Sequence, residues 1–219
     1  MTRVLLIPGS TRDGSLHTSA LRTAAHLAPE GIAALLYGGL TGLPAFVPGD
    51  PGPPPVAELR RLIAEADALM FSTPQYAGSL PGSLKNLLDW LVDGGDLARK
   101  PAAWLSVVPP GQDDGACEAL EAVLGHGDAR LLKAACIRLP LEMSSVDGAG
   151  TVTDPRLHLA LQDMLHALIG AMALPEPRQQ PSWQVHSSVY PVIQAPSTPG
   201  FVSGQSAWPG VQTWKGNDG

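Results

Sequence analysis

A short segment near the N-terminus, residues 8–15, gathers side chains of the types that bind anions. It reads Pro-Gly-Ser-Thr-Arg-Asp-Gly-Ser, so Ser10 and Ser15 flank the guanidinium of Arg12. It follows an apolar run and precedes an amphipathic stretch, which places it between a strand and a helix N-terminus. Free backbone N–H groups, the positive end of the helix dipole and a guanidinium together favour phosphate. The segment predicts an anion site, although the same serines also suit a plain turn and helix cap.

A second polar segment, residues 73–86, reads Thr-Pro-Gln-Tyr-Ala-Gly-Ser-Leu-Pro-Gly-Ser-Leu-Lys-Asn. It offers an amide at Gln75, a phenol at Tyr76 and exposed backbone around two prolines. Such groups suit a planar polar ring, edged by Gln75 and flanked by Tyr76. The alternative is a turn-rich loop in which Tyr76 covers the edge of the core.

A third segment, residues 108–115, reads Val-Pro-Pro-Gly-Gln-Asp-Asp-Gly. Its prolines remove backbone donors. Its two aspartates, Asp113 and Asp114, are expected to repel an anionic ligand.

Several other chemistries are not supported by the sequence. Neither the P-loop pattern G-x-x-x-x-G-K-[ST] nor the dinucleotide pattern G-x-G-x-x-G occurs, and no G-x-S-x-G nucleophile elbow is present. His158 and His166 are eight positions apart without an H-E-x-x-H pattern. We therefore expect no metal site and no hydrolase nucleophile.

The elements that position these segments alternate along the chain. Apolar runs predict strands at residues 4–7, 32–37, 68–71 and 102–108, with a fifth within residues 131–139. Amphipathic stretches predict helices that start near residues 15, 56, 81, 116 and 154. This alternation predicts a flavodoxin-like, five-stranded, parallel, doubly wound sheet with strand order 2-1-3-4-5. In that order the three polar segments meet at the carboxyl ends of strands one, three and four.

Composition and charge narrow the functional classes. The 219 residues are 44% hydrophobic, and 14 Lys and Arg against 20 Asp and Glu give a net charge of −6, which argues against a large nucleic-acid surface. The sequence contains no apolar run of membrane-spanning length. The first apolar run is too short for a signal peptide, and Cys117 and Cys136 form no disulfide framework. A cytoplasmic protein with no nucleic-acid or membrane partner is expected.

The last 45 residues differ from the rest. Residues 175–219 hold seven prolines, five glycines and four charged residues. That composition predicts an irregular or partly disordered extension. Its three tryptophans, Trp183, Trp208 and Trp214, favour docking of some of it on its own domain or on a partner subunit. We therefore divide the chain into a domain at residues 1–174 and an extension at residues 175–219.

Two segments carry a resemblance to a known family. Residues 9–17 read GSTRDGSLH, and residues 74–90 read PQYAGSLPGSLKNLLDW. The chain resembles the NAD(P)H-dependent FMN reductases, a flavodoxin-like group that includes azo-, quinone and chromate reductases. In that family a G-S-x-R-x-G-S-x-N loop holds the FMN phosphate, and a P-[EQ]-Y-N-x-S-x-P-G-x-L-K-N-x-x-D-W segment holds the ribityl chain and ring edge. Residues 43–46, LPAF, also resemble the family's loop after strand two.

The resemblance, which covers about residues 1–174, implies a set of cofactor-binding residues. Phosphate binding is implied for Ser10, Arg12 and Ser15, and contact with the flavin for Pro74, Gln75, Tyr76 and Gly78. His17 and Ala77 occupy positions at which the family has asparagine, and we include both among the expected cofactor-binding residues. A histidine donor suits a phosphate, particularly when it is protonated.

The resemblance also implies an activity. It is that of an FMN-dependent oxidoreductase that takes hydride from NADPH or NADH and reduces a small acceptor, such as a quinone, an azo compound, free flavin or a metal oxyanion. Because the flavin carries the chemistry, no catalytic side chain is assigned. A homodimer or homotetramer is implied. Two alternatives stay open: a flavin-poor interaction module whose extension is the contact surface, and an FMN electron carrier without nicotinamide activity.

Overall fold

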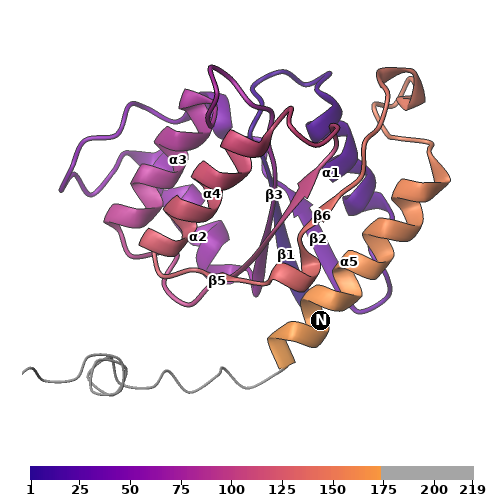
Figure 1. The fold of residues 1–219 in the computed structure, drawn as a ribbon. Helices are drawn as coiled ribbons and strands as arrows, with labels where there is room; N and C mark the ends of the chain where they lie inside the picture. The colour runs from indigo at the N-terminus through magenta and orange to yellow at the C-terminus, as the bar shows by residue number, and fades with distance from the viewer. Residues whose placement is uncertain (174–219) are drawn as a thin grey trace, which may run out of the picture. The chain divides into compact units, whose positions relative to one another are not determined.

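The computed structural model describes residues 1–173, which form a parallel sheet covered by helices (Figure 1). The strand order is β2-β1-β3-β4-β5, with β6 also paired to β4, and every pair is parallel. The predicted flavodoxin-like sheet order is thereby confirmed. The strands are β1 (Thr2–Pro8), β2 (Ile32–Leu36), β3 (Ala68–Ser72), β4 (Pro101–Ser106), β5 (Arg130–Leu131) and β6 (Ile137–Arg138). The predicted extension from residue 175 onward lies outside the described residues.

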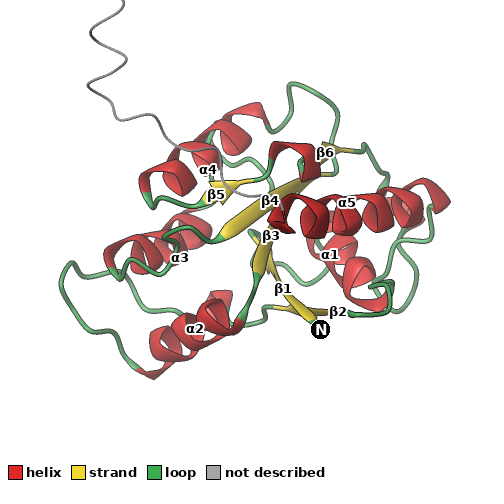
Figure 2. Ribbon diagram, turned by 90° about the horizontal axis from the view of Figure 1, so that it is seen from below, coloured by secondary structure: helices red, strands yellow, loops and turns green. Residues whose placement is uncertain are grey.

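Helices cover both faces of this sheet. They are α1 (Leu16–His26), α2 (Pro54–Glu65), α3 (Gly82–Asp93), α4 (Asp114–His126) and α5 (Pro155–Ala173). Figure 2 shows α1 and α5 on one face and α2, α3 and α4 on the other. Side chains along β1 point alternately to the two faces of the sheet. Leu6 joins the core under α1 and α5, while Leu5 and Ile7 join the core on the opposite face. The central strands are mainly apolar because both of their faces are buried over most of their length.

The fifth strand is the element whose prediction needs correction. In place of one strand within residues 131–139, two short strands, β5 and β6, pair with successive parts of β4. A 3-10 turn at Lys133–Ala135 separates them. This turn buries Ala135 completely in the core that contains α5, so the chain leaves the sheet there and returns two residues later.

The carboxyl ends of β1 and β3 lie side by side, because Pro8 is in register with Ser72. The Gly9 N–H donates to the Ser72 carbonyl at 2.8 Å. The loop after β1 therefore runs directly against the loop after β3, as the predicted strand order requires.

Gly9 leaves no room for a side chain at this contact. A Cβ there would lie 2.1 Å from Thr73 Oγ1 and 2.9 Å from Leu84 Cδ2. We expect Gly9→Ala to lower the free energy of unfolding by about 1–3 kcal/mol, the usual effect of overpacking. Gly14→Ala in the same loop is the control, since nothing lies within 4 Å of its Cβ position. Denaturant unfolding of both variants tests this, and equal stabilities would contradict it.

Candidate functional site at the carboxyl edge of the sheet

The loop between β1 and α1 is folded by its own polar groups. Ser10 is buried, and its Oγ accepts a hydrogen bond from the Arg12 N–H at 3.1 Å. The Ser15 N–H in turn donates to the Arg12 carbonyl at 3.1 Å. Because Ser10 Oγ acts here as an acceptor, its own hydroxyl proton stays available for a ligand.

Several donors in this loop have no partner within residues 1–173. Ser15 stands at the N-cap of α1 and is buried, yet its side chain makes no capping bond. Thr18 Oγ1, in the first turn of α1, is buried without a hydrogen-bond partner. The guanidinium of Arg12 is exposed, and no ion pair with a described residue engages it. Two hydroxyls and a guanidinium at a helix N-terminus are the donor set that a phosphate monoester requires, so the site fits the phosphate of FMN.

Thr18 was not among the predicted site residues. Its position, three residues after the N-cap Ser15, was the signal available in the sequence. A threonine in the first turn of a helix is also common for structural reasons. Only its burial without a partner identifies it as a candidate ligand.

His17, the second residue of α1, is buried beside this loop. Its side chain is 5% exposed, and its Nδ1 lies 3.0 Å from Ser72 Oγ at the end of β3. Burial lowers the pKa of His17 to about 4. The imidazole is therefore neutral near pH 7, in contrast to the protonated donor that best suits a phosphate.

The loop after β3 begins with a tight turn. Tyr76 and Ser79 exchange two backbone hydrogen bonds of 3.0 Å, while Ala77 and Gly78 have φ values of +49° and +77°. Positive φ at both central residues defines a type I′ turn. Tyr76 is 50% exposed, so half of its surface is open to a ligand.

Alanine is a poor residue for the first central position of this turn. Asn-Gly is the preferred pair there, since a positive φ is unfavourable for most L-residues. We expect Ala77→Asn to raise the free energy of unfolding by about 1 kcal/mol and Ala77→Val to lower it. Chemical denaturation of the ligand-free protein measures both, and a shift in the same direction for the two variants would contradict this assignment.

The second and third loops contact each other. Gln75 Oε1 accepts a hydrogen bond from the Ala116 N–H in the first turn of α4 at 3.1 Å, which leaves the amide NH₂ of Gln75 free to donate. Gly115 is equally close, because a Cβ on it would lie 2.2 Å from the Gly78 carbonyl oxygen. All three polar segments thus converge at one edge of the sheet.

The acidic character of the third loop is offset by one arginine. Arg138 on β6 forms ion pairs with Asp113 at 2.7 Å and with Asp114 at 2.8 Å, and it donates to the Pro109 carbonyl at 3.3 Å. Asp113 is 1% exposed, so this carboxylate does not face a ligand. The side chain of Asp114 is 54% exposed, so the expected repulsion of an anionic ligand by this loop stays a prediction.

The cysteine nearest to this loop is not a candidate nucleophile. Burial, followed by the proximity of Asp113, raises the pKa of Cys117 to about 12. A thiol with so high a pKa stays protonated near neutral pH, and the thiolate is the reactive form. The site therefore holds no activated sulfur at this position.

Part of the predicted ring-binding segment has a structural role instead. Asn86 Nδ2 and Trp90 Nε1 both donate to the Pro44 carbonyl, at 2.8 and 3.0 Å, and Asn86 Oδ1 accepts from the Phe46 N–H at 2.7 Å. The rings of Phe46 and Trp90 meet edge to face with centroids 5.1 Å apart. These contacts fasten the loop after β2 to α3.

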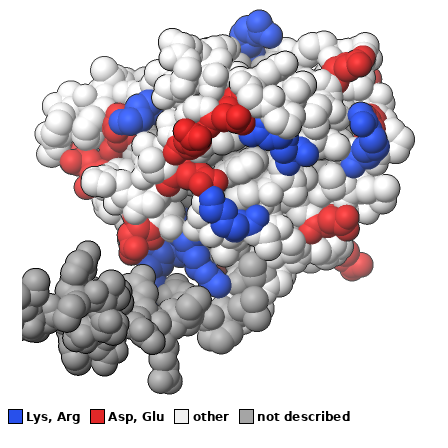
Figure 3. Space-filling model, in the orientation of Figure 1, with Lys and Arg blue, Asp and Glu red and all other residues white. Residues whose placement is uncertain are grey.

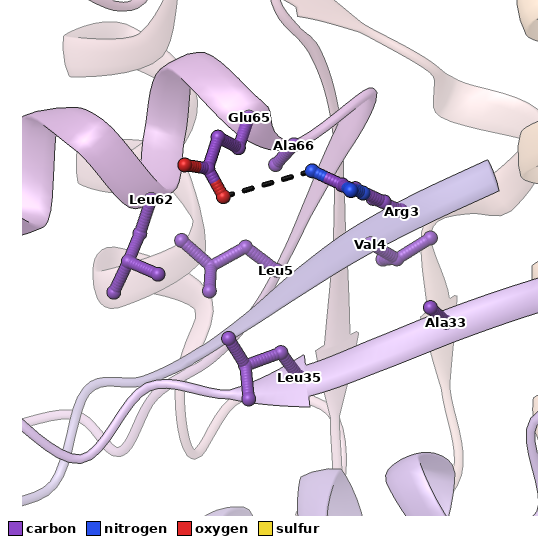
Figure 4. Close-up of a pocket in the computed structure, with 8 residues that line it drawn as sticks. All are labelled: Arg3, Val4, Leu5, Ala33, Leu35, Leu62, Glu65 and Ala66. Carbon is purple, nitrogen blue, oxygen red and sulfur yellow. Dashed lines mark ion pairs between the residues drawn. The ribbon is translucent and has the colours of Figure 1, made fainter. Parts of the chain in front are cut away.

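Two hollows of the described residues differ in their position relative to the three loops. One of about 240 Å³ opens beside β1, β2 and α2 (Figure 4) and contains an Arg3–Glu65 ion pair of 3.6 Å. None of the predicted site residues lines it. The other, of about 490 Å³, extends from Pro109 in the third loop to Arg156 at the start of α5. Only this second hollow adjoins the candidate site.

Charge on the face seen in Figure 3 is mixed. Lysines and arginines lie among aspartates and glutamates there, and no extended basic surface is formed. Nucleic-acid binding requires such a surface. Within residues 1–173, no helix combines the length and the apolar character needed to cross a membrane.

Fold and site together define the class of protein. A flavodoxin-like sheet with a phosphate-type donor set at its topological switch point is the arrangement of a mononucleotide-binding α/β protein. Residues 2–139 match the family described as NADPH-dependent FMN reductase. The chain belongs to this family.

Known relatives agree with that assignment. An NAD(P)H-dependent FMN reductase of Pseudomonas aeruginosa is 31% identical over 172 residues, which cover 76% of this chain and 92% of the relative. An NADPH:quinone oxidoreductase of Arabidopsis thaliana is 38% identical over 114 residues, 48% of this chain and 58% of the relative. Among solved structures, the flavoenzyme NAD(P)H:(acceptor) oxidoreductase FerB of Paracoccus denitrificans has a TM-score of 0.63 at 25% identity, covering 78% of this chain and 97% of its own.

Proposed function

We propose that the protein is an FMN-dependent NAD(P)H oxidoreductase that acts on quinone-type acceptors. The observation that carries the proposal is the set of unengaged donors on the β1–α1 loop of a chain that belongs to the FMN reductase family. Quinone acceptors are favoured because relatives from Arabidopsis thaliana and Escherichia coli carry the names NADPH:quinone oxidoreductase and quinone reductase. No feature of the described residues favours azo compounds or metal oxyanions.

The first two loops have distinct tasks in this proposal. Bound FMN supplies the redox chemistry, accepting hydride from the nicotinamide and passing electrons to the acceptor. Ser10, Arg12 and Ser15 hold the phosphate by hydrogen bonds and charge. The residues that line the ring are Pro74, Gln75, Tyr76, Ala77 and Gly78. Because Gln75 Oε1 is already engaged by Ala116, its NH₂ group donates to the ring edge and fixes its orientation.

Purified protein tests this function directly. We expect the protein to bind FMN and then to oxidise NADPH or NADH only when a quinone such as benzoquinone is supplied or oxygen accepts the electrons. Binding of FMN without nicotinamide oxidation would instead identify an electron carrier. A protein that does not bind FMN would refute the proposal and favour an interaction module.

We further propose a cytoplasmic homo-oligomer whose FMN-binding domain is residues 1–174, with residues 175–219 as an extension outside that domain. The domain division is supported by the family match to residues 2–139. It is also supported by the position of the residues proposed to bind FMN, all of which precede residue 93. Deletion of residues 175–219 is expected to leave FMN affinity unchanged. Light scattering on the full chain measures the oligomeric state, and a monomeric mass would contradict that part of the proposal.

A further inference from the structure

The hydroxyl of Ser72 determines which nitrogen of His17 carries the proton. A serine hydroxyl has a single proton to donate. Ser72 donates it to the Leu105 carbonyl at 2.7 Å, a bond that joins β3 to β4. Ser72 Oγ can therefore only accept at its 3.0 Å contact with His17 Nδ1. The neutral ring is the Nδ1–H tautomer, and its Nε2 bears a lone pair.

His17 lies next to the residues of the proposed phosphate site. His17 is the second residue of α1, between Ser15 and Thr18, and Ser72 ends the strand next to β1. Within the described part of the chain His17 Nε2 has no hydrogen-bond partner. The other ring nitrogen is engaged by Ser72, so Nε2 is the nitrogen left to contact a ligand in the β1–α1 loop.

Charged groups around His17 do not decide its protonation in the free protein. The pKa of His17 is lowered by burial alone, without a contribution from any charged side chain. Strands β2, β3 and β4 carry no charged residue. The charged or titratable residues of the loop before α1 and of the other elements packed on this helix are Arg3, Arg12, Asp13, Arg156, His158, Asp163 and His166.

A phosphate dianion cannot be accommodated beside this nitrogen without a further proton. All terminal oxygens of the dianion are hydrogen-bond acceptors, and the unprotonated Nε2 is an acceptor as well. If the two face each other, neither has a hydrogen bond at this contact and their lone pairs repel. A proton taken from solvent removes the conflict. It bonds either to Nε2, which then donates to the phosphate, or to a phosphate oxygen, which then donates to Nε2.

We propose that His17 Nε2 and an FMN phosphate oxygen share one proton in the complex, so that FMN binding takes up a proton from solvent. The inference rests on the proposed function and goes further by assigning a proton-dependent role to a residue that stands in place of the family's asparagine. An asparagine donates through its NH₂ group and needs no proton for this contact. The presence of histidine in place of asparagine therefore makes the affinity for FMN depend on pH.

The direction of this dependence follows from linkage. The complex holds one proton more than the free protein and free FMN wherever the free phosphate is a dianion, which is above about pH 6. Raising the pH above that value therefore weakens binding, by about tenfold per pH unit at the steepest point. Below about pH 6 the free phosphate already carries the proton, and the affinity levels off.

Calorimetric titration of the full chain with FMN at pH 7.5, in buffers of different ionisation enthalpy, measures the protons taken up. We expect about one proton for the unaltered protein and close to none for His17→Asn. Riboflavin, which lacks the phosphate, is the ligand control and should take up none. Ser72→Ala is a second variant that keeps the imidazole: without the Ser72 acceptor, His17 can adopt the Nε2–H tautomer and donate to the dianion, so proton uptake should fall.

Each outcome bears on a separate statement. FMN binding with equal proton uptake by the unaltered protein and His17→Asn would overturn the shared proton and leave the proposed function standing. Uptake that persists in full in Ser72→Ala would overturn the role of the tautomer. Failure of the unaltered protein to bind FMN would overturn the proposed function itself.

Discussion

Replacing Arg138 by methionine is expected to lower the free energy of unfolding by about 3–5 kcal/mol, the range for removing one partner of a buried ion pair. The cause is Asp113, which is 1% exposed and relies on Arg138 at 2.7 Å for its countercharge. Methionine keeps much of the apolar stem of the arginine, so the variant isolates the loss of charge. Equilibrium denaturation by urea measures the change.

Two further variants make this result specific. Lys133→Met removes an exposed ion pair with Glu121, and its expected cost is about 1 kcal/mol or less. Adding Asp113→Asn to Arg138→Met removes the stranded charge and should restore part of the lost stability. If Arg138→Met were no more destabilising than Lys133→Met, the ion pair with Asp113 would not support the third loop.

Replacing Arg12 by alanine is expected to weaken FMN binding by about 1.5–3 kcal/mol, the range for a hydrogen bond to a charged group. That loss corresponds to a dissociation constant roughly 10- to 150-fold higher. No described residue engages the guanidinium, so its removal breaks no ion pair within residues 1–173 and leaves the fold intact. Quenching of flavin fluorescence measures the affinity.

Controls for Arg12 separate site chemistry from overall charge. Arg61→Ala removes the same charge from the surface of α2, where the side chain pairs with Glu58 and Glu65, and should leave FMN affinity unchanged. Arg12→Lys keeps the charge without the planar donor fork and should give an intermediate loss. An unchanged affinity in Arg12→Ala would remove the phosphate assignment of this loop.

Much of the fold could be predicted from the local pattern of apolar and polar residues. The runs that became β1, β3 and β4 are mainly apolar because both faces of the sheet are buried there, and the amphipathic stripes of the helices follow from the same burial. The fifth strand could not be read in this way. Leu132 and Ala135 are apolar whether they lie in a strand or in a 3-10 turn, and contact with α5 decides between the two.

The site likewise has features that the sequence predicts and others that depend on contacts between distant residues. Strand order alone predicts that the three loops converge, and the structure shows that they do. Arg138 was not predicted as a partner of Asp113, because the two are 25 positions apart and only the pairing of β6 with β4 brings them together. The neutral state of His17 was equally hidden, since it depends on Ser72 and on burial rather than on neighbouring residues in the sequence.

The Arg138 ion pairs also set an order of assembly during synthesis on the ribosome. The loops after β1 and β3 are complete once the chain has emerged through α3, which ends at Asp93. The loop after β4 is different, because Asp113 has no countercharge until Arg138 has left the exit tunnel and β6 has paired with β4. A nascent chain halted before that point therefore leaves Asp113 without its ion-pair partner.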